Sequence, residues 1–469
     1  MPRQSCQLRA TLSPSAAERQ ALGRLRIGGG RRLHGIVHVA GAKNAALPIM
    51  AAAILADEPI RLDRVPCLAD VETLASVLRR LGIDVHRSDD GSLSVETIDR
   101  RAFHTGYAHV RRMRASFCVL GPLLARRRRA VVSLPGGCRI GPRPVDLHLR
   151  GLAALGADLR IERGNVVAHA SRLRGARIDL AGPSGTTVTG TTNVMSAAVL
   201  ASGVTTITSA AVEPEIVDLG RFLNRMGARI EGLGTSTLRI HGVEQLGGAD
   251  YRVIPDRIEA ATLLLAGAIT QGRVTVAGVE PDHLASVLDQ LDAAGFQLDV
   301  ESDRITLASC GPARPRDIVA RPYPGMPTDL QAQWTALLAL APGTSRVVDT
   351  VFPQRFQHLA ELQRLGADVR LEGANAAIRG VGELAGAPVR ATDLRAGAAL
   401  VLAGLAAKGE TVVSGLNHLD RGYEDLDGKL ARLGAEIRRE EVHDMIDHRA
   451  CCIPLVGPVN RNSASRAGC

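Results

Sequence analysis

One short pattern occurs six times in this chain of 469 residues, and it constrains the fold more than any other feature. The copies read LRRLGIDV, LAALGADL, LNRMGARI, LDAAGFQL, LQRLGADV and LARLGAEI, with glycines at positions 82, 156, 227, 295, 366 and 434. Each copy is typical of the end of an amphipathic helix, a glycine that stops it, and the start of a strand. The glycines are 68 to 74 residues apart. Such a regular period predicts six structural units of one kind.

A second, Ala-rich helix accompanies each copy. These helices are expected to begin near Asn44, Arg114, Thr191, Arg257, Asp329 and Arg395. They are apolar nearly all round, so each must be buried on all sides. Each unit then consists of a buried helix, an amphipathic outer helix and several strands. The sequence therefore predicts an α/β (α+β) fold.

The starts of the buried helices are polar although their bodies are apolar. A helix N-terminus attracts anions, because its free N–H groups carry a partial positive charge. Basic side chains stand at four of these starts: Lys43, Arg114, Arg257 and Arg395. If the six starts face one cleft, that cleft binds anions. Ordinary capping by Asn44, Thr328 and Thr392 would explain single helix starts, but it does not explain the recurring charge.

The composition favours anionic small molecules over other partners. The chain has 57 Lys and Arg against 48 Asp and Glu, and only three of the basic residues are lysines. This arginine excess fits the codon preference of a GC-rich genome, and it also fits two-pronged binding of phosphate or carboxylate. Six Phe, four Tyr and one Trp offer no base-stacking platform for nucleic acid.

No membrane span, secretory signal or metal site is expected. The longest apolar run, 12 residues from Ala45, is shorter than the roughly 20 that span a bilayer. The first residues lack the apolar core of a signal peptide, so we expect a cytoplasmic protein with reduced thiols. The eight cysteines show no zinc-ligand spacing. A metal site could be imagined only near the C-terminus, from His443, His448, Cys451 and Cys452, and a disordered tail is the preferred interpretation.

Long motifs in this chain resemble those of the UDP-N-acetylglucosamine 1-carboxyvinyltransferase family, whose members are enolpyruvyl transferases. The motifs are GAKNAALP, PGGCRIGPRPVDLH, EPEIVD, PDRIE, PTDLQAQ, TVFPQRF, ATDLRAG and DRGYE, in this order within residues 25–439. The resemblance implies a two-domain inside-out α/β barrel with three units per domain. One domain would comprise residues 43–251, and the other residues 22–42 and 252–439. Residues 1–21 and 440–469 would be extensions, which we expect to be disordered.

The resemblance also implies an activity. The family transfers the enolpyruvyl group of phosphoenolpyruvate to the 3′-hydroxyl of UDP-N-acetylglucosamine and releases phosphate, the first committed step of peptidoglycan synthesis. Both substrates are anions, no cofactor is implied, and the oligomeric state stays open. The chemistry requires a proton at C3 of phosphoenolpyruvate, deprotonation of the acceptor hydroxyl, and exclusion of water.

Candidate site residues follow from the resemblance. Cys138 corresponds to the family's loop cysteine, usually described as the proton donor, and Asp329 to the carboxylate beside the acceptor hydroxyl. Arg139 and Arg143 should lower the pKa of the Cys138 thiol, and we expect fosfomycin to alkylate it. The phosphoenolpyruvate set is Lys43, Arg143, Arg395 and Arg421, and Lys43 and Arg421 are also expected to be catalytic. The UDP-sugar contacts are Asn44, Arg114, Arg143, Pro144, Val145, Asp146, Leu147, Thr187, Val188, Asp329 and Val351.

Two positions depart from the family pattern. Cys118 stands where the family often has an aromatic residue, and Gly185 where many members have lysine or another polar residue. These departures leave open the same chemistry on another UDP-sugar or a specialised-metabolite acceptor, and also a non-catalytic UDP-sugar sensor. A 5-enolpyruvylshikimate-3-phosphate synthase would share the fold. The Cys138 loop and the Arg-Pro-Val-Asp-Leu run after it argue against that enzyme.

Overall fold

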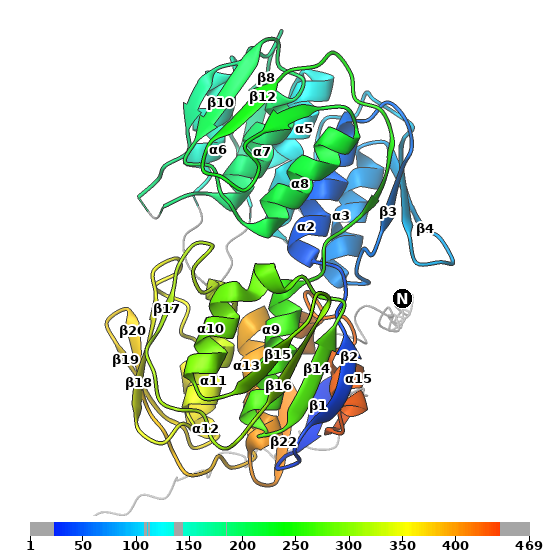
Figure 1. Cartoon of the computed structure of the whole chain (residues 1–469). Helices are drawn as coiled ribbons and strands as arrows, with labels where there is room; N and C mark the ends of the chain where they lie inside the picture. Colours follow the sequence, from blue (N-terminus) through cyan, green and yellow to red (C-terminus); the bar gives the residue numbers. More distant parts are fainter. Residues whose placement is uncertain (1–22, 107–109, 111–112, 136–143, 184, 441–469) are drawn as a thin grey trace, which may run out of the picture.

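Two hydrophobic cores lie one above the other in the view of Figure 1. The computed structural model describes residues 23–106, 110, 113–135, 144–183 and 185–440. The upper core combines residues between Ala42 and Ile254, which we call the first half. The lower core combines Leu25 to Val39 with Ile258 to Leu433, which we call the second half. The chain thus begins in the second half, builds the first half, and returns.

The first half packs three sheets around helices. Its sheets have the strand orders β13-β3-β5-β4, β6-β8-β7 and β11-β12-β10-β9. The strands are β3 Ile60–Asp63, β4 Ile83–Arg87, β5 Leu93–Thr97, β6 Arg129–Ser133, β7 Asp158–Glu162, β8 Asn165–His169, β9 Arg177–Asp179, β10 Val204–Thr208, β11 Arg229–Glu231, β12 Leu238–His241 and β13 Ala249–Arg252. The helices are α2 Lys43–Ala52, α3 Ala69–Arg80, α5 Leu120–Arg127, α6 Asp146–Ala154, α7 Val188–Ala198 and α8 Pro214–Arg225, with 3₁₀ helices η1 Ala53–Leu55 and η2 Arg114–Val119.

The second half has three sheets as well, with the orders β15-β16-β14-β2, β17-β18-β20-β19 and β21-β22-β1-β23. The strands are β1 Arg24–Gly28, β2 His34–His38, β14 Arg273–Ala277, β15 Gln297–Val300, β16 Arg304–Ala308, β17 Ile318–Ala320, β18 Thr344–Asp349, β19 Asp368–Glu372, β20 Asn375–Arg379, β21 Pro388–Arg390, β22 Glu410–Ser414 and β23 Glu436–Glu440. The helices are α9 Arg257–Ile269, α10 Ala285–Ala293, α11 Gln331–Leu338, α12 His358–Arg364, α13 Leu394–Ala406, α14 Leu416–Leu419 and α15 Leu426–Arg432, with 3₁₀ helices η3 Pro281–Leu284 and η4 Thr328–Leu330.

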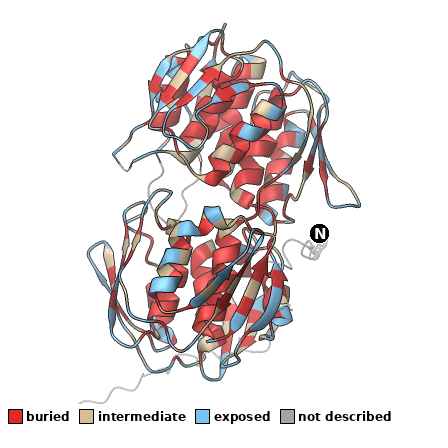
Figure 2. Cartoon of the chain, viewed as in Figure 1, coloured by how far each residue is buried: buried red, intermediate tan, exposed pale blue. Residues whose placement is uncertain are grey.

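The Ala-rich helices lie in the interior, as the sequence predicts, and Figure 2 shows them almost wholly buried. Every residue of α11 is buried, and so is every residue of α9 after Arg257. The amphipathic helices cover them with one face only; α10, for example, buries Val287 and Leu291. This division puts the polar starts of the buried helices at the ends of the two cores.

The six glycines of the repeated pattern all have a positive φ, between 75° and 106°. Each follows an outer helix and precedes a strand; Gly366, for example, stands between α12 and β19. A side chain with a Cβ rarely adopts this left-handed backbone, so glycine is the residue that ends these helices cheaply. The local structure predicted for all six copies is therefore confirmed.

The helix caps differ from the expectation. The side chains of Thr187, Asp256 and Asp393 cap α7, α9 and α13 by accepting backbone N–H groups. Asn44 lies inside the first turn of α2 instead. The Thr328 hydroxyl donates to Asp349 Oδ2 at 2.5 Å, which removes it from a capping role. Thr392 stands one residue before the true cap, and a carboxylate at that place accepts two N–H groups at once.

Two chain segments, residues 40–42 and 254–256, connect the halves and are hydrogen-bonded to each other. The Ala42 N–H donates to the Ile254 carbonyl at 2.8 Å, and the Asp256 N–H to the Ala40 carbonyl at 3.0 Å. A Cβ on Gly41 would lie 1.6 Å from the Arg64 carbonyl oxygen, so only glycine fits there. Among the described residues, no helix is long and apolar enough to cross a membrane.

Candidate active site

The starts of four helices, α2, α9, η4 and α13, lie close together where the halves join. The Asp256 carboxylate accepts the backbone N–H of Lys43 at the start of α2 at 3.3 Å, and those of Ile258 and Glu259 in α9 at 2.8 and 3.0 Å. The other two starts are joined by Arg395 Nη2, which donates to Asp329 Oδ2 at 2.9 Å. The charge of Asp256 also acts on Arg395. The junction is therefore polar, charged and largely buried.

Lys43 and Arg421 approach each other through a shared carboxylate. Lys43 Nζ lies 3.3 Å from Asp70 Oδ2, and Arg421 Nε donates to Asp70 Oδ1 at 2.8 Å. Burial lowers the pKa of the Lys43 ammonium, while the charge of Asp70 raises it. The charges of Arg395 and Arg421 lower it further. The three cations predicted to bind phosphoenolpyruvate, apart from Arg143, are thus close enough to act on one another.

Asp329 is held by two arginines. Arg355 Nη1 donates to its Oδ1 at 2.8 Å, while its Oδ2 accepts from Arg395. Burial alone would raise the pKa of the Asp329 carboxyl, but the charges and hydrogen bonds of the two guanidinium groups hold it well below its ordinary value. In this arrangement Asp329 is ionised and its basicity is low.

Arg395 retains unused hydrogen-bonding capacity. Its Nε and Nη1 are buried and make no hydrogen bond within the described part of the chain. Its guanidinium lies 5.3 Å from the centre of the Tyr423 ring, which supports the cation from one side. Buried N–H groups without acceptors cost free energy. They are therefore well suited to receive a carboxylate or phosphate of a ligand.

The residues expected to bind the UDP-sugar form a second group in the first half. Arg114 Nη2 donates to the Pro144 carbonyl at 3.3 Å, which joins the start of η2 to the segment before α6. Asp146 is the exposed first residue of α6, and Leu147 is buried. Thr187 caps α7, and both Thr187 and Val188 remain half-buried.

Asn44 and Val351 lie at the edges of the charged cluster. Asn44 is half-buried in the first turn of α2, one residue after Lys43. The Val351 N–H donates to Asp349 Oδ1 at 2.9 Å, while the other oxygen of Asp349 accepts from Thr328, the neighbour of Asp329. These bonds hold the backbone of Val351 beside Asp349, at the edge of the charged cluster.

Several predicted positions lie outside the described residues. They are Cys138, Arg139, Arg143, His443, His448, Cys451 and Cys452. Within the described ranges, no group of three or more His, Cys, Asp or Glu side chains is arranged to hold a metal ion.

The two departures from the family pattern have structural consequences. Cys118 is buried in the core of the first half, where burial raises the pKa of its thiol to about 12. Gly185 is exposed with φ +91°, in a turn where it exchanges backbone hydrogen bonds with Gly182. A Cβ at Gly185 would lie 3.7 Å from the Pro322 ring of the second half, so this turn faces the junction of the halves.

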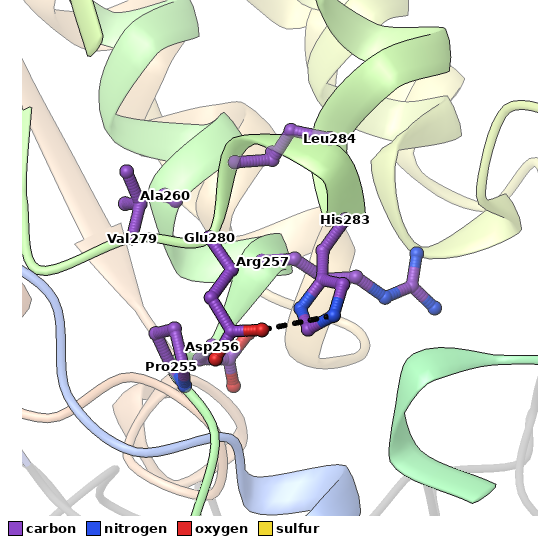
Figure 3. A pocket seen from close by; sticks show the side chains of 8 residues that line it. All are labelled: Pro255, Asp256, Arg257, Ala260, Val279, Glu280, His283 and Leu284. Carbon is purple, nitrogen blue, oxygen red and sulfur yellow. Dashed lines mark ion pairs between the residues drawn. The ribbon is translucent and has the colours of Figure 1, made fainter. Parts of the chain in front are cut away.

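A small pocket lies beside the start of α9 and shares Asp256 with the charged junction (Figure 3). In it, His283 Nε2 lies 3.1 Å from Glu280 Oε2. The Arg257 guanidinium points away from the other side chains in Figure 3 and reaches Glu215 of the first half, with Nε 2.9 Å from Oε1. The pocket is lined by Pro255, Asp256, Arg257, Ala260, Val279, Glu280, His283 and Leu284. Arg257 therefore joins the halves through Glu215, although its place at a helix start predicts a role in anion binding.

Three residues at the junction were not predicted as site residues from the sequence: Asp70, Asp256 and Arg355. Arg355 belongs to the quoted motif TVFPQRF, and Asp256 to PDRIE, so both motifs held a signal that could have been used. Asp70 is the second residue of an ordinary amphipathic helix and carries no such signal.

Two α/β halves with buried cations and carboxylates between them form a site suited to anionic ligands. The sequence profile described as EPSP synthase (3-phosphoshikimate 1-carboxyvinyltransferase) matches residues 27–445. This is most of the chain, so the chain belongs to that family of enolpyruvyl transferases.

Individual relatives show which members of the family this chain resembles. A UDP-N-acetylglucosamine 1-carboxyvinyltransferase from Akkermansia muciniphila is 50% identical over 421 residues, which cover 89% of this chain and 98% of that protein. The crystal structure of the enolpyruvyl transferase NikO from Streptomyces tendae superposes with a TM-score of 0.81 at 29% identity, over 90% of this chain and 99% of that one. An EPSP synthase from Acinetobacter baumannii has a TM-score of 0.69 at 17% identity, over 89% of this chain and 100% of that one. The last of these shows the fold alone.

Proposed function

We propose that this protein transfers the enolpyruvyl group of phosphoenolpyruvate to the 3′-hydroxyl of UDP-N-acetylglucosamine and releases phosphate. The observation that carries the proposal is the cluster of Lys43, Arg395 and Arg421 between the two halves, with the carboxylate of Asp329 inside it. The 50% identity to a relative named for this reaction supports the choice of acceptor. In this role the protein begins peptidoglycan synthesis in the cytoplasm, and it needs no cofactor.

The reaction is an addition followed by an elimination. The acceptor oxygen forms a bond to C2 of phosphoenolpyruvate while C3 gains a proton, for which Cys138 is the proposed donor. Asp329 takes the proton of the acceptor hydroxyl. The bond from C2 to the phosphate oxygen then breaks, phosphate leaves, and loss of a proton from C3 restores the double bond. Lys43, Arg143, Arg395 and Arg421 would hold the phosphate and carboxylate.

The pairing of Asp329 with Arg395 suggests how substrate prepares the base. An anion bound to the free Nε and Nη1 of Arg395 would compete with Asp329 for the guanidinium charge. The pKa of Asp329 would then rise, which makes the carboxylate a better proton acceptor. Arg355 would continue to orient it through Oδ1.

We also propose the domain division and the repeat. Residues 43–251 would form one domain, residues 22–42 and 252–439 the other, each an inside-out barrel of three units. The two separate cores and the three sheets of each half support this division. Residues 1–21 and 440–469 would be extensions.

Phosphate release from phosphoenolpyruvate tests the proposed function. Release should require UDP-N-acetylglucosamine and should collapse in Cys138→Ala. Cys310→Ala is the matched control, because Cys310 is an exposed free cysteine far from the proposed site in sequence. Release with shikimate 3-phosphate or another UDP-sugar in place of UDP-N-acetylglucosamine would assign a different acceptor. Binding of the UDP-sugar with no phosphate release would indicate a sensor.

A further inference from the structure

Three short segments of the first half carry the proposed UDP-sugar contacts. They are the start of η2 at Arg114, residues 144–147 around the start of α6, and residues 187–188 at the start of α7. Arg114 is bonded to the first residue of the second segment. Leu147 lies against Gly182 in the turn that leads to the third, since a Cβ on Gly182 would lie 2.9 Å from Leu147 Cδ1.

One buried histidine lies beneath all three segments. His148 is the third residue of α6 and is 1% exposed. Its Nε2 lies 3.1 Å from the Thr189 hydroxyl in the first turn of α7. Its Nδ1 lies 2.9 Å from Asn193 Nδ2, further along α7. Its ring meets the Phe117 ring of η2 edge-on, with centroids 5.2 Å apart.

The neighbouring bonds fix which nitrogen of His148 carries the proton. Asn193 Oδ1 accepts the Gly121 N–H at 2.7 Å, and Asn193 Nδ2 donates to the Phe117 carbonyl at 3.1 Å. Asn193 therefore presents an N–H to His148, whose Nδ1 must be the acceptor. The proton then resides on Nε2, which donates to Thr189. Burial lowers the pKa of His148 to about 3, with Arg114 adding to the effect, so the ring stays neutral near neutral pH.

We propose that His148 is a positioning residue for the UDP-sugar, because its Nε2–H to Thr189 bond holds the start of α7 at a fixed distance from the start of α6. Residues 144–147 and residues 187–188 then present one continuous surface to the nucleotide. This inference rests on the proposed function, since it concerns that site. His148 would act on the UDP-sugar site without touching the ligand itself.

The two hydrogen bonds of His148 differ in importance. Asn193 is already held by Gly121 and Phe117, so α7 keeps its contact with η2 without His148. The Thr189 hydroxyl has no other bonded partner within the described residues. Loss of the bond to Thr189 therefore removes a side-chain bond between the first turn of α7 and α6, whereas loss of the bond to Asn193 leaves the bonds between α7 and η2 in place.

Single substitutions separate the two bonds. A glutamine side chain can place an N–H near the position of Nε2, whereas an asparagine side chain can replace only Nδ1. We expect His148→Leu and His148→Asn to raise KM for UDP-N-acetylglucosamine about tenfold, the effect of losing one good hydrogen bond. KM for phosphoenolpyruvate and kcat should stay within about twofold. His148→Gln should restore most of the affinity. His86→Gln is the matched control, because His86 is an exposed histidine of the same half.

Thr189 gives a second route to the same bond. Thr189→Val should reproduce the effect of His148→Leu, and the double variant should be no worse than either single variant. Calorimetric binding of UDP-N-acetylglucosamine without phosphoenolpyruvate measures the same affinities when turnover is absent.

The outcomes distinguish this proposal from the proposed function. If the wild type does not release phosphate with UDP-N-acetylglucosamine, the proposed function fails, and calorimetry still decides the role of His148. Equal losses for both substrates, or a full loss in His148→Gln, would reduce His148 to a core residue and overturn the proposal. Unchanged affinity in a folded His148→Asn would also overturn it.

Discussion

At the scale of single residues, the charge state of Asp329 depends on Arg355 as well as Arg395. Two guanidinium groups hold the pKa of this carboxyl below its ordinary value. A group of this kind stabilises the folded state at pH values above its ordinary pKa. That contribution is lost as the pH falls through the lowered pKa of the folded state. Removing one arginine should therefore change both the acid stability and the acid limb of activity.

Arg355→Met tests this dependence. The variant leaves Asp329 with Arg395 alone, so the pKa of the carboxyl rises and the acid limb of kcat/KM should move to higher pH. The thermal-stability difference from wild type should be present at pH 7 and should shrink below about pH 4. Arg364→Met is the control, since Arg364 is an exposed arginine whose Nε lies 3.7 Å from Glu361 Oε2 and donates to the Pro388 carbonyl at 3.1 Å. An active variant with an unshifted acid limb would contradict the argument.

At the scale of elements, Asp256 joins two helices of different halves with one carboxylate. Its Oδ1 caps α9, and its Oδ2 accepts the first N–H of α2. Asp393 caps α13 in the same way, but within the described part of the chain it accepts only the backbone N–H groups of Arg395 and Ala396 in its own helix. The two caps are therefore comparable, and the difference between them is the contact with α2.

Replacing the two caps by alanine should separate these effects. Loss of a cap costs about 1 kcal/mol in free energy of unfolding, and Asp256→Ala should cost more than Asp393→Ala because the Lys43 N–H also loses its acceptor. Asp256→Asn can keep the cap of α9 through its oxygen, but its NH2 group is a donor and cannot accept the Lys43 N–H, so the loss should be smaller than in Asp256→Ala and should reflect the contact with α2. Urea unfolding measures all three. Equal losses for the two alanine variants would show that the bond to α2 contributes nothing.

The sequence predicted the starts and ends of helices better than it predicted contacts between residues far apart in the chain. The start of α9 at Arg257 and the stop of each outer helix at its glycine follow from local chemistry, and both are found as predicted. The start of α7 was placed at Thr191 but lies at Val188, because Thr187 supplies the cap. The bond between Asp70 and Arg421 joins residues 351 positions apart. No local pattern encodes such a pair, which arises only when the two halves pack.

At the scale of the whole molecule, the pair of Glu215 and Arg257 is one of the buried contacts that join the two halves. Glu215 begins α8 in the first half, and Arg257 begins α9 in the second. Their side chains are 5% and 10% exposed, and Tyr323 lies against the guanidinium, its ring centre 5.4 Å away. The hydrogen bonds to Glu215 hold Arg257 in this position, so the pair couples the halves.

Glu215→Gln should weaken this coupling. It leaves a buried guanidinium without its carboxylate, which costs about 3 kcal/mol. The only tryptophan of the chain, Trp334, is buried in α11, so its fluorescence reports the second half, whereas circular dichroism reports both. The two unfolding transitions in urea should move further apart in Glu215→Gln than in wild type, because the halves no longer stabilise each other. Glu301→Gln, which breaks an exposed pair with Arg304 at 3.6 Å, should change stability by less than about 0.5 kcal/mol. Transitions that stay as close together in Glu215→Gln as in wild type would place the coupling of the halves elsewhere, in the bond between Asp70 and Arg421 or in the two hydrogen-bonded connections beside Gly41.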